Sequence, residues 1–236
     1  MILSRQYSFW GSLSPLGGLA GASLLIMASA RLSWAITVAG SLFWVYGLTA
    51  LTYSFLFTNF GGKFFPVKGR AIVYTCIAAF FGSLYLFMFW LLCPFAALEV
   101  FMLLLLVPLF CAGSGITLLL SSAAKKSVTA DGNTRYYNVP EKSNIDIFEY
   151  ISIAVSQAAF LAVLMIAFSI IREPLSYCSL SFPGTYRGMI TIMYFNENSF
   201  FPIGIFSNSA GALLLLGYLV CLYQYGKDRF SPGDNK

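Results

Sequence analysis

Two short stretches combine proline, glycine and small polar residues inside otherwise apolar sequence. They are the best candidates in the chain for a binding site. Proline removes a backbone hydrogen bond and glycine weakens a helix, so both free polar backbone groups that can bind an ion or a solute. The candidate site residues are Pro15, Gly17, Gly18, Gly21 and Ser23 in the first stretch, and Pro108, Cys111, Gly113, Ser114 and Gly115 in the second. The alternative is that these small residues serve only close helix packing.

The chain lacks the residue types that most catalytic and metal sites need. It has no histidine, and its five cysteines stand singly at Cys76, Cys93, Cys111, Cys178 and Cys221. Histidine-based nucleophile pairs, proton relays and metal ligands are therefore excluded, and the cysteine spacing predicts neither a disulfide framework nor a zinc motif. We expect no metal site and a non-catalytic protein.

Charged side chains are also missing at membrane depth. The apolar stretches hold no Lys, Arg or Asp, and the acid nearest to one is Glu99, which we expect near a helix start. Because pumps usually place carboxylates at depth, the chain has no charged coupling site of its own. Ser156, Gln157 and the freed carbonyls near Gly17 and Gly113 are the neutral groups able to contact an ion.

The composition sets the class of elements that must position these residues. Of the 236 residues, 58% are apolar and 10% charged, and the mean hydropathy is +0.78. Such a chain is an integral membrane protein rather than a soluble enzyme. Its net charge of +5 lies in short clusters between uncharged stretches, so it indicates membrane topology and not a nucleic-acid-binding patch.

Six apolar segments are long enough to cross a bilayer as helices, since each crossing needs about 20 residues. We predict an all-α integral membrane protein with helices near Pro15–Ala30, Trp34–Phe57, Arg70–Cys93, Leu98–Leu120, Phe148–Ile171 and Phe201–Tyr225. Residues 1–120 hold the first four helices, 121–147 form a cytoplasmic loop, and 148–236 hold the last two, with a long outer loop at 172–199 and a short cytoplasmic tail. All belong to one membrane domain.

The loop at 121–147 divides the six helices into two halves of three, which must have opposite orientations in the membrane. The first helix of each half carries one of the proline–glycine stretches, so we predict inverted repeats with interrupted first and fourth helices. Gly17, Gly18 and Gly21 should then face Gly113, Ser114 and Gly115 near the membrane midplane. Gly82 is predicted to lie in an uninterrupted helix.

Basic residues predict the orientation. Eleven of the 14 Lys and Arg fall on the side that holds both termini, and only Arg31, Arg172 and Arg187 fall on the other. The positive-inside rule therefore predicts cytoplasmic N- and C-termini. An alternative for the first segment is a cleaved secretory signal ending at Ala28-Ser29-Ala30.

Several motifs occur in an order that characterises one family. They are Ser14-Pro15 through Leu25, the loop Phe65-Pro66 through Arg70, Pro108-Leu109, Ala124-Lys125-Lys126, Ile171-Arg172-Glu173 and Pro202 through Phe206. In this order the chain resembles the E subunit of the Rnf complex and the equivalent D subunit of the sodium-translocating NADH:quinone reductase, Nqr. The resemblance covers nearly the whole chain.

The resemblance implies an iron–sulfur cluster held by one cysteine from each broken helix together with a sister subunit. In this sequence those positions read Leu24, or Ser23 with a shifted gap, and Ser114. Serine ligates such clusters poorly and leucine not at all, and Cys111, one turn before Ser114, is the single substitute. We therefore expect no cofactor bound by this chain alone, and no [2Fe-2S] cluster like that of family relatives.

The function implied by the resemblance is that of a membrane-embedded subunit of an Rnf/Nqr-like, redox-driven, ion-translocating electron transport complex, with a scaffold or ion-path role. Its partners would be other membrane subunits, an inverted sister subunit above all, and the lipid bilayer, with no nucleic acid. Its location would be the bacterial cytoplasmic (inner) membrane. The alternative is a small inverted-repeat transporter, or a transporter membrane component, that binds solute at the broken helices.

Overall fold

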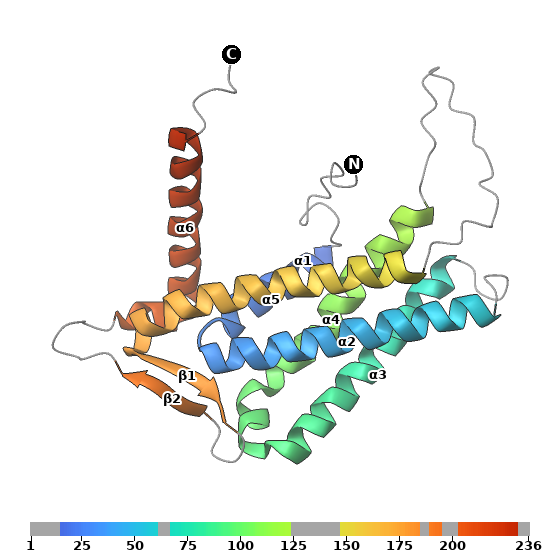
Figure 1. The fold of residues 1–236 in the computed structure, drawn as a ribbon, viewed down its shortest axis with the longest axis horizontal. Coiled ribbons are helices and arrows are strands. Elements are labelled where there is room, and N and C mark those ends of the chain that lie inside the picture. The colour runs from blue at the N-terminus through green and yellow to red at the C-terminus, as the bar shows by residue number, and fades with distance from the viewer. Residues whose placement is uncertain (1–14, 61–66, 124–146, 185–188, 195–202, 231–236) are drawn as a thin grey trace.

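The computed structural model describes residues 15–60, 67–123, 147–184, 189–194 and 203–230 (Figure 1). These residues are mostly helical. In chain order the elements are α1 (Pro15–Ala28), α2 (Leu32–Phe60), α3 (Val67–Leu92), α4 (Pro94–Ala123), α5 (Ile147–Tyr177), β1 (Ser179–Pro183), β2 (Met189–Tyr194), the 3-10 helix η1 (Gly204–Ser207) and α6 (Ser209–Phe230). Both chain ends and residues 124–146 of the predicted cytoplasmic loop lie outside the described residues, so the predicted orientation is not tested.

The helix α2 forms the centre of the bundle. It packs against α5 and also contacts α3 and α4, while α1 lies against α4 (Figure 1). The helices α2 and α5 are antiparallel, because the amide of Leu32 at the start of α2 donates a hydrogen bond to Glu173 near the end of α5. The helices α3 and α4 form a hairpin that turns at Cys93.

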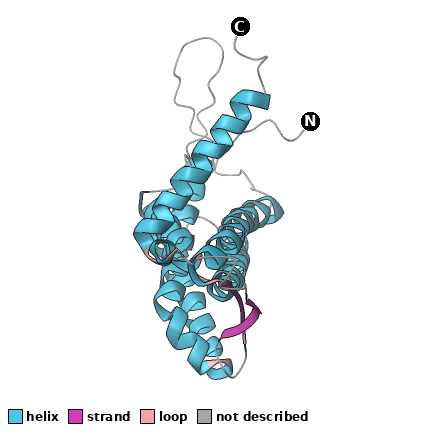
Figure 2. Cartoon of the chain, turned by 90° about the vertical axis from the view of Figure 1, so that its left-hand side faces the viewer, coloured by secondary structure: helices cyan, strands magenta, loops and turns pink. Residues whose placement is uncertain are grey.

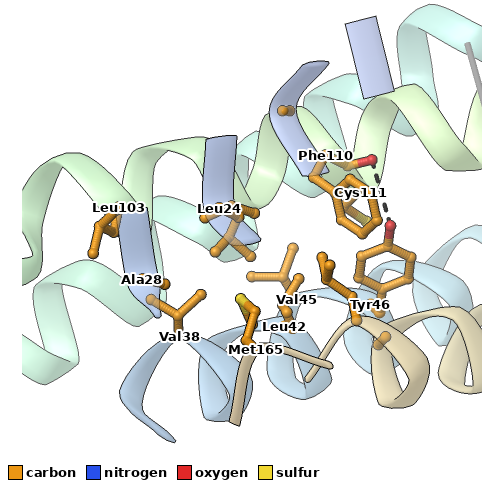
Figure 3. Close-up of a cluster of buried hydrophobic side chains, with 14 of the residues drawn as sticks. Leu24, Ala28, Val38, Leu42, Val45, Tyr46, Leu103, Phe110, Cys111 and Met165 are labelled. Carbon is orange, nitrogen blue, oxygen red and sulfur yellow. Dashed lines mark hydrogen bonds between the residues drawn. The ribbon is translucent and has the colours of Figure 1, made fainter. Parts of the chain in front are cut away.

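The interior is apolar, and much of the exterior is apolar as well. Fully buried side chains include Leu24, Leu42 and Met165, from α1, α2 and α5 (Figure 3). On α3, by contrast, Phe80 is 62% exposed and Leu92 is 66% exposed. An apolar surface of this extent is unfavourable in water and is typical of a lipid-facing helix.

Four of the six helices are long and apolar enough to cross a membrane. Their apolar spans are Leu32–Leu56 of α2, Ala71–Leu92 of α3, Pro94–Ser114 of α4 and Ala154–Tyr177 of α5. The other two predicted spans contain shorter apolar helices, Gly17–Ala28 in α1 and Ser209–Leu222 in α6. The predicted helices are therefore present within the described residues, but only four meet the length requirement for a span.

The structure is mostly helical, as predicted, but two features of the predicted fold need correction. The fourth helix is not interrupted: α4 continues through Pro108 and the glycines that follow it, and α1 is continuous from Pro15 to Ala28. The described chain is also not all-α, because β1 and β2 pair as an antiparallel hairpin inside the predicted outer loop, with Ser181 opposite Thr191. Cys178, with a φ of 51°, turns the chain from α5 into β1.

Candidate functional site

The two predicted glycine stretches meet where α1 crosses α4. A Cβ added at Gly17 would lie 2.9 Å from the carbonyl carbon of Gly113 and 3.2 Å from the Ser114 nitrogen. Real Cβ atoms essentially never approach another heavy atom so closely, so the two backbones touch only because residue 17 has no side chain. Glycine at this position therefore sets the distance between the helices.

One turn further along α1, a second glycine accommodates an aromatic ring. A Cβ at Gly21 would lie 2.8 Å from a ring carbon of Phe110. Going forward along α1 from Gly17 to Gly21, the contacts on α4 go backward from Gly113 to Phe110. The helices α1 and α4 are therefore antiparallel where they cross. The crossing is tight at two successive turns.

Pro108 causes no break in α4 because α3 makes room for its ring. A Cβ added at Gly82 would lie 2.8 Å from Pro108 Cγ and 2.9 Å from its Cβ. Gly82 does lie in an uninterrupted helix, α3, as predicted, but it contacts Pro108 of the neighbouring helix. This glycine on α3 lets the hairpin partner close around the proline that the sequence singled out.

Behind the crossing, hydroxyl groups form a buried hydrogen-bonded cluster. The Tyr46 hydroxyl and the Ser114 hydroxyl share a short hydrogen bond. The Tyr46 hydroxyl also lies 3.4 Å from the carbonyl oxygen of Phe110 (Figure 3), and the Ser114 hydroxyl donates to the Cys111 carbonyl at 3.1 Å. These bonds satisfy polar groups that would otherwise be buried unpaired.

The cluster continues to the Cys111 thiol. Its sulfur lies 3.6 Å from the Tyr74 hydroxyl of α3, and Thr49 of α2 lies beside it. Tyr46 is the central residue of α2, about 21 Å from either end at about 1.5 Å per residue. The site is thus a group of neutral hydroxyl and thiol side chains at mid-helix depth, held by α2, α3 and α4.

Not every candidate residue reaches this site. Nothing lies within 4 Å of a Cβ added at Gly18, and the Ser23 hydroxyl turns back to the Leu19 carbonyl of its own helix. Pro15 begins α1 as described, and Gly115 lies within α4. Thus Gly17, Gly21, Cys111, Gly113 and Ser114 take part in the crossing or the cluster, Pro108 packs against Gly82 of α3, and Gly18 and Ser23 contact neither.

The polar residues predicted outside the two stretches lie elsewhere. Glu99 lies in the second turn of α4 and accepts an exposed hydrogen bond from the Trp34 indole nitrogen at 3.3 Å. The Gln157 side-chain oxygen is buried and has no hydrogen-bond partner among the described residues. Neither adds a charge to the cluster.

The sequence reasoning missed Arg172, a buried charge near the end of α5 that is only 1% exposed. Among the described residues, its acceptors come from two places in the chain. At the end of α1 they are the Ile26 carbonyl and the Ser29 hydroxyl; before α6 they are the carbonyls of Phe206, Ser207 and Asn208. The signal available in the sequence was an arginine inside an otherwise apolar helix.

The adjacent Glu173 is buried as deeply but has different partners. One carboxylate oxygen accepts from the Leu32 amide at the start of α2, at 2.8 Å, and the other from the Ser181 amide of β1, at 3.0 Å. A carboxylate at a helix start satisfies an unpaired amide and complements the helix dipole. Arg172 and Glu173 therefore join α1, α2, β1 and α6 at one end of the bundle.

The two positions at which the resemblance implies cluster ligands are already engaged in packing or hydrogen bonds. Leu24 is fully buried among apolar side chains (Figure 3), and the Ser114 hydroxyl is hydrogen-bonded to the Tyr46 hydroxyl. Within the described residues, no three of the metal-ligating types Cys, Asp, Glu and His come together. The donor set at the crossing is thus one thiol and several neutral hydroxyls, a poor fit to an iron–sulfur cluster.

This fold and site define a class: a helical protein whose four long apolar helices suggest a membrane location, with a tight helix crossing beside a buried neutral polar cluster. Comparisons with protein-family models, with curated proteins and with solved structures find no match to this chain.

Proposed function

We propose that this chain is a non-catalytic membrane subunit of an Rnf/Nqr-like, redox-driven, ion-translocating complex of the bacterial inner membrane, with a scaffold role and an inverted sister subunit as its partner. The observation that carries the proposal is the antiparallel crossing of α1 and α4 at Gly17 and Gly113. That crossing joins the two stretches on which the family resemblance depends.

The pairing of helices supports an inverted repeat of three helices. Under such a repeat α1 corresponds to α4 and α2 to α5. A pseudo-two-fold axis then brings corresponding helices together in antiparallel pairs. The helix α1 does pack antiparallel on α4, and α2 packs antiparallel on α5. These are the two pairs expected of an axis through the middle of the bundle.

A scaffold role fits the site better than solute binding does. A transporter of this design needs space and freed carbonyls where the helices break. Here both helices are continuous, and the backbones of Gly17 and Gly113 are already in contact. The glycines thus serve close packing, which favours the scaffold proposal over the transporter alternative.

Deletion of the gene tests the proposal of a scaffold subunit without cluster ligands. The gene would be deleted from its host, and NADH- and ferredoxin-driven ion transport would be measured in inverted membrane vesicles. We expect transport to fall on deletion and to be restored by the wild-type chain and equally by Cys111→Ser. Unchanged transport after deletion would refute the subunit proposal, and failure of Cys111→Ser alone would revive Cys111 as a ligand.

The proposed orientation, with both termini in the cytoplasm, is tested separately. Alkaline phosphatase fused after Lys236 should be inactive, while a green fluorescent protein at the same place should fluoresce, because each folds on one side of the membrane only. The opposite pattern would place the C-terminus outside and contradict the orientation that the basic residues predict.

A further inference from the structure

At the end of the bundle where α5 ends and α2 begins, Arg31 is held by three elements. Figures 1 and 2 show the β1–β2 hairpin at this same end. The guanidinium carbon of Arg31 lies 5.6 Å from the centre of the Trp34 ring of α2 and 5.1 Å from that of the Tyr177 ring of α5. One terminal nitrogen donates to the Met189 sulfur of β2, at 3.0 Å. Aromatic rings attract a cation through their π electrons, so neutral groups fix the position of Arg31 without cancelling its charge.

Glu99 of α4 lies at the edge of the same Trp34 ring. One of its carboxylate oxygens accepts the indole N–H at 3.3 Å. Within the part of the chain that the structure describes, neither Arg31 nor Glu99 forms an ion pair. The carboxylate of Glu173 also lies at this end, but both its oxygens accept from backbone amides. One indole ring therefore separates a cation from an anion, and both charges lie within reach of a single small ligand.

Arg31 lies where two of the apolar spans end. The span Leu32–Leu56 of α2 begins at the next residue, and the span Ala154–Tyr177 of α5 ends at the tyrosine whose ring contacts the guanidinium. The ends of apolar spans lie at the level of the lipid headgroups, where Trp and Tyr rings are enriched. The Arg31 guanidinium is therefore at the depth of the lipid phosphates.

Glu99 lies on a surface of α4 that is apolar and exposed. The Glu99 side chain is itself exposed, and its neighbours along the helix, Leu98 and Met102, are each 69% exposed. Phe95, one turn earlier, is exposed as well. A carboxylate beside lipid-facing side chains is unfavourable unless it meets a cation. A primary ammonium in the headgroup layer supplies both a positive charge and N–H donors.

We propose that Arg31, Trp34 and Glu99 bind the headgroup of one phospholipid that carries a primary ammonium, phosphatidylethanolamine. The lipid phosphate accepts hydrogen bonds from the Arg31 guanidinium, which binds such groups through several N–H donors at once. The lipid ammonium donates to the Glu99 carboxylate at the edge of the indole ring. One zwitterionic headgroup thus neutralises both charges. The proposal depends on a membrane location and not on the family resemblance or the inverted repeat.

Native mass spectrometry of the full chain with defined lipids tests the proposal. The probes are phosphatidylethanolamine, phosphatidylcholine and phosphatidylglycerol with identical acyl chains. Phosphatidylcholine keeps the phosphate, but its quaternary ammonium has no N–H, and phosphatidylglycerol has no ammonium. We expect the wild-type chain to bind phosphatidylethanolamine about tenfold more tightly than either of the others, because only this lipid can donate to Glu99. Equal binding of the three lipids, or a preference for phosphatidylglycerol, would overturn the proposal.

Three variants assign the preference to this site. Glu99→Gln should abolish it, and because Glu99 is exposed and glutamine still accepts from Trp34, the fold should be retained, which circular dichroism checks. Arg31→Gln should weaken the binding of all three lipids by about fivefold or more. The matched control, Arg70→Gln, removes the same charge at the start of α3, which runs antiparallel to α2 and so begins at the other end of the bundle. It should change neither quantity, and an undiminished preference in Glu99→Gln would refute the site.

Discussion

Replacing Gly17 with alanine probes the helix crossing most directly. The new Cβ would lie 2.9 Å from the Gly113 carbonyl carbon, 3.2 Å from its Cα and 3.2 Å from the Ser114 nitrogen. All three atoms belong to the α4 backbone, which cannot rotate away as a side chain could. Restoring normal contact distances of about 3.5–4.0 Å requires α1 to move away from α4.

The adjacent glycine provides a matched control. Overpacking of this kind destabilises a protein by about 1–3 kcal/mol. Alanine also gains about 1 kcal/mol over glycine from helix propensity, in both Gly17→Ala and Gly18→Ala. This gain is the same for both variants and cancels in the comparison. A Cβ at Gly18 meets nothing within 4 Å, so only Gly17→Ala is overpacked. Gly17→Ala should therefore be less stable than Gly18→Ala by about 1–3 kcal/mol.

The comparison is measurable by thermal unfolding in mild detergent, followed by circular dichroism. For a chain of this size, 1 kcal/mol corresponds to about 2–4 °C in Tm. We expect the Tm of Gly17→Ala to be at least about 2 °C below that of Gly18→Ala. Equal values, or a higher Tm for Gly17→Ala, would refute the backbone contact between α1 and α4.

Three further predictions concern the contacts around this crossing and the base of α6. Gly82→Ala should lower stability by about 1–3 kcal/mol, and adding Pro108→Ala should recover part of that loss. A double-mutant cycle of unfolding free energies measures the recovery, and strict additivity would mean that the two residues do not touch. Arg172→Leu should destabilise the protein by on the order of 3 kcal/mol or more, because several buried carbonyls lose their donor. Limited proteolysis should then cut before α6, and an unaltered proteolysis pattern would contradict the role of Arg172 in holding the base of α6. Tyr46→Phe should cost about 1 kcal/mol in chemical unfolding. The cost should be smaller in a Ser114→Ala background, where the bond to Ser114 is already lost and only the contact with the Phe110 carbonyl remains; an undiminished effect there would mean that the bond to Ser114 contributes nothing.

Part of the site could be predicted from the sequence because glycine and proline report on the backbone. In a helix at membrane depth, residues without side chains are retained where another backbone approaches, and Gly17 meets Gly113 in this way. The same reasoning was wrong about helix breaks. A proline removes one hydrogen bond, but Gly82 on a neighbouring helix accommodates its ring, and α4 continues.

The hydroxyl cluster and the buried charge could not be predicted in the same way. Tyr46 and Tyr74 are two of 14 tyrosines, and no pattern along the chain separates them from tyrosines at a membrane interface. Arg172 was counted among the few basic residues of the outer side. Its role depends on carbonyls that lie 34–36 and 146 residues away in the chain.

The sequence by itself determined the class of protein and the positions of its helices, because hydropathy and helix length are sums over neighbouring residues. It also determined where two backbones can touch, since only glycine permits that distance. The tertiary structure decided which helices are paired, how Pro108 is accommodated, and that α6 projects from the bundle whereas α3 packs on α4. These features depend on contacts between residues far apart in the chain, and the local composition around one residue does not specify which distant residue it will contact.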